Sequence, residues 1–201
     1  DRIKTVVEQG AGIVKAILGF STGSGEEPVM CDLNSVVGET IQLLGDRFQR
    51  DTAVIFKPAP DLPQVPTVKG FIQQILLNFV FNAAEAEAAV KRKQVILSTQ
   101  RVQRTPENLV LVAAPAPEYV AISVQDFGCG IPPEIRPRIF EPFFTTKALS
   151  ARRGTGLGLS MVYELAKKLD AGLSVESTVD VGSTFTLIVP VKELKANESE
   201  K

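Results

Sequence analysis

Hydrophobic side chains recur with a helical period in four segments of the chain. The clearest segment is Phe71–Ala89, whose apolar residues follow the spacing i, i+3, i+4, i+7, i+8, i+11 and so share one face. This pattern predicts a helix with one buried side. The same reasoning predicts helices over Asp1–Phe20, Ser35–Arg47 and Gly156–Leu169.

Short apolar runs between these segments predict β-strands. They are Ala53–Lys57, Val95–Thr99, Leu109–Val112, Tyr119–Gln125, Leu173–Ser177 and Ser183–Val191, of which the last two read as a hairpin. A proline-rich connection covers residues 58–66, and residues 101–118 read as a surface excursion that holds one strand. Helices and strands in this order predict an α+β fold, a two-layer sandwich with one sheet against a layer of helices.

Composition divides the chain into four parts. Residues 1–22 are predicted to form a helix whose apolar positions follow a 4-3-4-3 spacing, which suits a partner helix in a bundle. Packing of that helix on its own domain is the alternative. Residues 23–31 are rich in Gly, Ser and Glu and read as a linker, residues 32–191 form one domain, and residues 192–201 form a charged tail.

Charge and residue counts exclude several classes of function. The net charge of −1 lacks the basic excess that nucleic-acid binding requires, so no nucleic-acid partner is expected. No apolar run approaches the roughly 18 residues of a membrane span, so we expect no direct membrane contact of this chain. Its two cysteines cannot staple a domain of this size, which favours a reducing compartment. We therefore expect a cytoplasmic location, with the cytoplasmic part of a membrane-anchored protein as the alternative. The chain contains no histidine, which excludes Ser-His-Asp catalysis and HExxH zinc sites.

The predicted helix 71–89 also carries a polar stripe on its other side. Gln74, Asn78, Asn82 and Glu85 lie 4, 4 and 3 residues apart and therefore share one narrow face. Asparagine is a poor helix former, so two of them in an apolar helix need an explanation. Either the carboxamides bind neighbouring loops, or a carboxamide oxygen coordinates a hard cation that carries a polyphosphate.

Two glycine-containing loops follow in the sequence. Asp126 ends a strand and begins a DxGxG stretch through Gly130, where an aspartate can accept a hydrogen bond from an exocyclic amine such as that of adenine. The stretch Gly154–Ser160, GTGLGLS, opens a helix, and free backbone N–H groups at a helix start form an anion site. An Asp-Gly turn without a ligand is the alternative for the first loop.

The segment between these loops is Ile139–Lys147, followed by a basic stretch. Its three phenylalanines suggest a hinge packed on one side, with a mobile lid after it. Lys147, Arg152 and Arg153 are candidates to meet phosphate charge, and a solvated basic loop is the alternative.

Taken in this order, the motifs resemble those of a known family. Asn78 with Asn82, the DxGxG stretch, the FEPFF stretch at Phe140–Phe144 and GTGLGLS resemble the N, G1, F and G2 boxes of sensor histidine kinases. The resemblance covers about residues 32–190 and implies the Bergerat ATP-binding fold, a mixed sheet against helices, which gyrase B and MutL share. It also implies that residues 1–22 are the second helix of a truncated dimerisation bundle.

The resemblance implies roles for individual residues. Asn82 would bind Mg²⁺, Asp126 the adenine amino group, and Phe140 and Phe143 would pack the lid hinge. The implied catalytic residues are Asn78, Lys147 and Arg153. The implied nucleotide contacts are Asn78, Asn82, Glu85, Asp126, Gly128, Gly130, Ile131, Thr146, Lys147, Gly154, Thr155, Gly156, Leu157, Gly158 and Leu159.

The resemblance also implies the reaction and the partners. The domain would bind Mg-ATP and transfer its γ-phosphoryl group to a histidine on an upstream helix, for relay to the receiver domain of a response regulator. In the whole protein the bundle would form a homodimer. Relatives that hydrolyse ATP carry a glutamate where this chain has Asn78, and a carboxamide is no general base, so transfer is favoured over hydrolysis. The alternatives are a non-catalytic nucleotide-gated scaffold, or a serine kinase or ATPase of the same fold.

Overall fold

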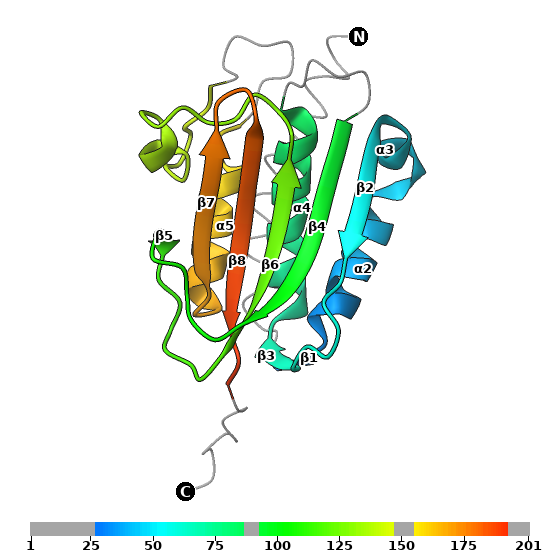
Figure 1. The fold of residues 1–201 in the computed structure, drawn as a ribbon, viewed down its shortest axis with the longest axis vertical. Helices are drawn as coiled ribbons and strands as arrows, with labels where there is room; N and C mark the ends of the chain where they lie inside the picture. Colours follow the sequence, from blue (N-terminus) through cyan, green and yellow to red (C-terminus); the bar gives the residue numbers. More distant parts are fainter. Residues whose placement is uncertain (1–26, 87–92, 147–154, 193–201) are drawn as a thin grey trace, which may run out of the picture.

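The computed structural model describes residues 27–86, 93–146 and 155–192 (Figure 1). Its core is a mixed sheet of six strands in the order β2-β4-β6-β8-β7-β5. Only β2 and β4 run parallel, and every other neighbouring pair is antiparallel. The sheet strands are β2 (Thr52–Lys57), β4 (Lys93–Val102), β5 (Leu109–Leu111), β6 (Tyr119–Asp126), β7 (Gly172–Thr178) and β8 (Gly182–Pro190).

The main helices lie on one face of this sheet (Figure 1). They are α2 (Leu33–Leu43), α4 (Lys69–Glu85) and α5 (Gly158–Lys168), with α3 (Gly45–Asp51) at the β2 edge and a short 3-10 helix, η1 (Arg136–Arg138). This arrangement confirms the predicted α+β two-layer sandwich. No helix within the described ranges combines the length and the apolarity that crossing a bilayer requires.

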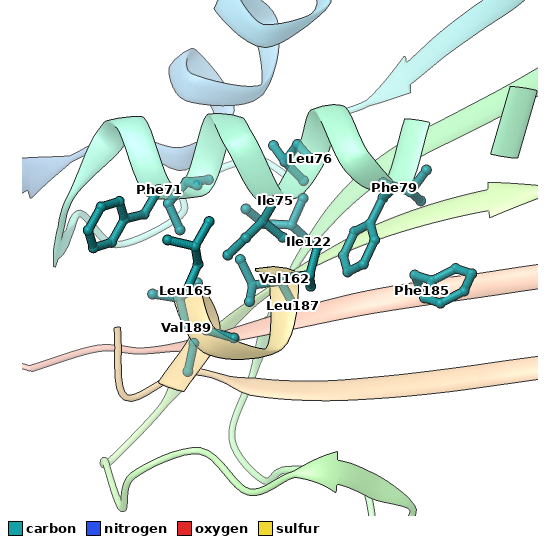
Figure 2. Close-up of a cluster of buried hydrophobic side chains, with 14 of the residues drawn as sticks. Phe71, Ile75, Leu76, Phe79, Ile122, Val162, Leu165, Phe185, Leu187 and Val189 are labelled. Atoms are coloured by element: carbon teal, nitrogen blue, oxygen red, sulfur yellow. The ribbon is translucent and has the colours of Figure 1, made fainter. Parts of the chain in front are cut away.

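The buried core lies between α4, α5 and the sheet. Figure 2 shows the apolar face of α4 turned toward side chains of α5 and of the central strands. Phe79 of α4 is fully buried, and its ring centroid lies 5.2 Å from that of Phe185 on β8. Burial of an apolar side chain of this size stabilises a fold by about 1.5–3 kcal/mol. The packing therefore fixes which side of α4 faces away from the sheet.

The element boundaries differ from the sequence prediction in several places, and the helix predicted over Phe71–Ala89 spans Lys69–Glu85. The helix predicted over Ser35–Arg47 is two helices, because Gly45 has a φ of +70° that turns the chain between them. The helix predicted from Gly156 begins at Gly158. The strands β1 (Val29–Cys31) and β3 (Val65–Thr67) were not predicted and pair antiparallel, so a strand lies in the range predicted as a linker.

The segment between β4 and β6 is largely exposed and holds one strand, as predicted for a surface excursion. Its strand β5 pairs with β7, and Ala113 packs with Tyr119 against Ile188 on the side of the sheet that the helices leave open. These three residues are at most 7% exposed. The segment buries a second, smaller apolar cluster, which removes Ile188 from water.

Candidate nucleotide site

The polar side of α4 faces away from the core that fixes the helix. Asn78 and Asn82 are half-buried on this side, one turn apart. The Asn78 Nδ2 donates to the backbone oxygen of Gln74 at 2.9 Å, which holds that carboxamide along the helix. The sequence therefore places two carboxamides on a surface that core packing does not use.

The amino end of α5 lies directly against Asn78. A Cβ atom built on Gly158 would lie 2.8 Å from the Asn78 Oδ1, closer than an ordinary contact. The helix begins at Gly158, and no side chain caps its first N–H groups. Free N–H groups and the positive end of the helix dipole attract anions. An anion bound there would lie beside Asn78.

The carboxamide of Asn82 has no hydrogen bond in the described part of the chain. Its Nδ2 is buried without a partner, and no described residue donates to its Oδ1. A buried carboxamide that served only the fold would have partners within it. The residue therefore fits a role toward a ligand, and its oxygen is of the type that Mg²⁺ accepts.

Asp126 ends β6 in a buried position. It is 4% exposed, and its Oδ1 accepts N–H bonds from Gly128 at 2.8 Å and from Ser183 at 3.3 Å. Its Oδ2 has no hydrogen bond from the described residues. Burial raises the pKa of this carboxyl, and the two N–H bonds oppose that effect. One oxygen is thus fixed by the backbone and the other is open to a donor from a ligand.

The loop after Asp126 touches both α4 and the β7–β8 hairpin. Gly128 lies so close to Ala86, at the end of α4, that any side chain would collide with it. Gly130 has a φ of +69° and packs on the carbonyl of Thr178. The next residue, Ile131, donates its N–H to the Ser177 Oγ at 2.7 Å. The predicted glycines therefore make room for protein neighbours in this structure.

These groups define an elongated site along the polar side of α4. Asn78 contacts the amino end of α5, and Ala86, eight residues later, contacts the loop after Asp126. Eight residues of helix span about 12 Å. The site therefore offers an anion-binding end and a hydrogen-bond acceptor at opposite ends. Asn82, whose buried Nδ2 has no partner among the described residues, lies between them.

Other predicted site residues lie at the margins of this region. Leu157 and Leu159 flank Gly158, and the Thr155 Oγ1 accepts the N–H of Leu157 at 3.4 Å. Gly156 accepts the N–H of Phe143 at 2.9 Å, Thr146 is exposed, and Glu85 is exposed on the last turn of α4. Lys147, Arg152, Arg153 and Gly154 lie outside the described residues.

The two phenylalanines predicted to pack the hinge differ from each other. Phe140 packs against the core, with its ring centroid 6.2 Å from that of Tyr163. Phe143 is 73% exposed and has a φ of +64°, so only its backbone contributes to the contact with Gly156. At Phe143 a backbone hydrogen bond to Gly156 holds the segment, because the exposed ring of Phe143 does not pack on the core.

Sequence reasoning missed Ser177 and Ser183. The Ser183 contact to Asp126 uses a backbone N–H, which every residue type except proline carries, so no residue pattern marks it. No cluster of three or more His, Cys, Asp or Glu residues suited to a metal occurs in the described ranges. A metal held here would depend on carboxamide oxygen and on the ligand itself.

Comparison with known proteins identifies the family. A family model described as "Histidine kinase-, DNA gyrase B-, and HSP90-like ATPase" matches residues 67–193, which is more than half of the chain. The sensor kinase CckA of Brucella abortus (strain 2308) is 32% identical over 200 residues, which cover 98% of this chain and 21% of that protein. The histidine-protein kinase AtoS of Escherichia coli (strain K12) is 30% identical over 180 residues, 89% of this chain and 26% of that protein.

Solved structures show the same fold. Full-length ShkA in complex with AMPPNP superimposes with a TM-score of 0.69 at 24% identity, over 92% of this chain and 36% of that one. The catalytic domain of histidine kinase ThkA gives 0.63 at 25% identity, over 82% of this chain and 98% of that one. The chain thus spans about a fifth to a quarter of the two curated relatives named above. It belongs to the family of histidine kinase-, DNA gyrase B- and HSP90-like ATPases.

Proposed function

We propose that this chain is the ATP-binding catalytic domain of a two-component sensor histidine kinase. One observation carries the proposal. The polar side of α4 has an open carboxylate oxygen of Asp126 at one end and the uncapped start of α5, at Gly158, at the other end. A nucleoside triphosphate has matching chemistry, with an amine on its base and anionic oxygens on its phosphates.

The residues divide the binding between them. Asp126 would accept the adenine amino group with its Oδ2, while the backbone holds its Oδ1. The first N–H groups of α5 would bind the phosphates. Asn82 would hold Mg²⁺, whose role when bound is to neutralise phosphate charge during transfer. Asn78 would fix the position of the α5 amino end relative to that metal ligand.

The acceptor of the phosphoryl group would lie outside this chain. The chain has no histidine of its own, and Asn78 has no basic atom that could activate water for hydrolysis. We therefore infer transfer to a histidine on an upstream bundle helix, followed by relay to the receiver domain of a response regulator. Residues 1–22 would belong to that bundle, through which the whole protein would dimerise. Positioning and charge neutralisation would supply the catalysis.

Calorimetric titration with a non-hydrolysable ATP analogue tests the site. We expect binding that requires Mg²⁺ and falls about tenfold or more in Asn82→Ala, because a metal ligand is lost. Asn108→Ala is the matched control, since Asn108 is exposed on the segment between β4 and β6. Equal affinity of Asn82→Ala and the unaltered chain would contradict the assigned metal ligand.

Phosphotransfer to a supplied bundle fragment with a histidine tests the reaction. We expect labelled phosphate from ATP to reach that fragment, and hydrolysis without the fragment to be slow. Tight nucleotide binding with no transfer to any histidine-bearing bundle would refute the kinase proposal and favour a nucleotide-gated scaffold.

A further inference from the structure

A half-buried arginine ties the loop after Asp126 to the β7–β8 hairpin. Arg136 begins η1, and its Nη2 donates to the backbone oxygen of Ser177 at 2.8 Å and to that of Ile131 at 3.4 Å. The first oxygen belongs to β7 and the second to the end of the DxGxG loop. One guanidinium group therefore bridges two segments that lie 46 residues apart in the sequence.

The bridged segments continue through hydrogen bonds to Asp126. The Ser177 Oγ accepts the N–H of Ile131 at 2.7 Å and lies 3.0 Å from the Ser183 Oγ. The N–H of Ser183 then donates to the Asp126 Oδ1 at 3.3 Å. The loop and the hairpin thus hold the carboxylate from two sides, and Arg136 lies at the outer end of this network.

Stability alone is a weak reason for an arginine at this position. No carboxylate pairs with Arg136 among the described residues, and its Nε is buried without a hydrogen-bond partner. Within the described part of the chain, a half-buried cation without a counter-charge and with one unsatisfied N–H contributes little to folding. What the side chain provides is a single nitrogen, Nη2, that donates to one carbonyl on each of the two segments at once.

We propose that Arg136 is a positioning residue for the nucleobase end of the site. It holds the loop 127–131 on the β7–β8 hairpin, so that the Asp126 carboxylate presents its open oxygen to the base in a fixed direction. Arg136 thereby sets the preference for a base with an amino group over a base with a carbonyl oxygen at the same place. This inference rests on the proposed function, because it requires a nucleotide in the site.

Base discrimination separates positioning from a general structural role. The affinities of the non-hydrolysable adenosine and inosine triphosphate analogues are measured for the unaltered chain and for Arg136→Gln. Inosine carries a carbonyl oxygen where adenosine carries the amine, so a correctly aimed carboxylate disfavours it. We expect Arg136→Gln to lower the adenosine affinity about tenfold, as for the loss of one good hydrogen bond, and the inosine affinity by less than about twofold.

Arg138→Gln is the matched control from the same turn. Arg138 pairs with Glu141 and lies over the ring of Phe144, and it has no contact with the Ser177 network. We expect the adenosine-to-inosine ratio of Arg138→Gln to match that of the unaltered chain. If Arg136→Gln lowers the affinity for both analogues by the same factor, or lowers neither, the inference is overturned.

A double variant checks that the effect passes through Asp126. In an Asp126→Asn background, Arg136→Gln should leave the adenosine affinity unchanged within about twofold, because the oriented group is already gone. A further tenfold loss would refute the mechanism. If Arg136→Gln fails to fold, Arg136→Lys decides, with an expected loss of about threefold for adenosine alone. Absence of adenosine binding by the unaltered chain would overturn the proposed function as well, whereas normal discrimination in Arg136→Gln would overturn this inference only.

Discussion

The contact between Gly158 and Asn78 allows one substitution to alter the site without removing the fold. In Gly158→Ala the new Cβ would lie 2.8 Å from the Asn78 Oδ1, about 0.6 Å inside the ordinary contact limit of 3.4 Å. The neighbour is the end of a side chain, so the least costly response is rotation of the Asn78 carboxamide. That rotation breaks the 2.9 Å bond to Gln74.

The two effects on stability nearly cancel. Loss of the Asn78–Gln74 hydrogen bond is worth about 1 kcal/mol. Replacing glycine by alanine in a helix returns up to about 1 kcal/mol, less at a first helical position. We therefore expect the free energy of unfolding in urea to change by less than about 1 kcal/mol. The affinity for the ATP analogue should nevertheless fall about tenfold, because Asn78 and the α5 amino end are displaced from each other.

Gly38→Ala is the matched control for this substitution. Gly38 lies in α2 with no atom within 4 Å of a built Cβ, so we expect a gain of about 0.5–1 kcal/mol and unchanged nucleotide affinity. In an Asn78→Ala background, Gly158→Ala should also become stabilising, since the obstructing group is absent. If Gly158→Ala destabilises the fold equally in both backgrounds, or if nucleotide affinity is unchanged, the reasoning about this contact is wrong.

Three further substitutions test the loop, the core and the carboxylate. Gly130→Ala should destabilise the fold by roughly 2–4 kcal/mol in urea unfolding, since its Cβ meets the backbone carbonyl of Thr178 at a positive φ; a change below about 1 kcal/mol would contradict this. Phe79→Ala should lower the free energy of unfolding by about 3–5 kcal/mol. Phe81 is 46% exposed, so Phe81→Ala should lower the free energy of unfolding far less. Asp126→Asn should weaken adenosine analogue binding about 10–100-fold, yet unfold no more easily than the unaltered chain at pH 7, since the amide oxygen still accepts both N–H bonds. Burial raises the pKa of Asp126, so the carboxyl favours folding when protonated; any stability advantage of Asp126→Asn should shrink as the pH falls through the raised pKa toward the ordinary value, and an advantage that grows on acidification would refute the sign.

Periodicity predicted the elements that bury a broad apolar face. The core face of α4 repeats over several turns, and so the helix and the polar side opposite its core face could be read from spacing alone. The positions of the six strands of the large sheet could be predicted from short apolar runs, and so could the β7–β8 hairpin. By contrast, β1 and β3 have three residues each, and one of them contains Pro66, so neither carries a recognisable strand pattern.

The relations between distant segments could not be predicted in this way. The N–H of Ser183 that orients Asp126 comes from 57 residues away and depends on the register of β6 with β8. The contact between position 158 and the Asn78 side chain depends on how closely α5 approaches α4. Such contacts arise from tertiary packing, whereas the sequence motif records only that a small residue is present.

The last strand of the described residues, β8, lies inside the sheet and not at its edge. β8 pairs with β6 on one side and with β7 on the other. A nascent chain therefore exposes two unpaired strand edges, one on β6 and one on β7, until residues 182–190 have been synthesised. Open edges of this kind favour association between chains. Association between chains is therefore most favoured just before residues 182–190 complete the sheet.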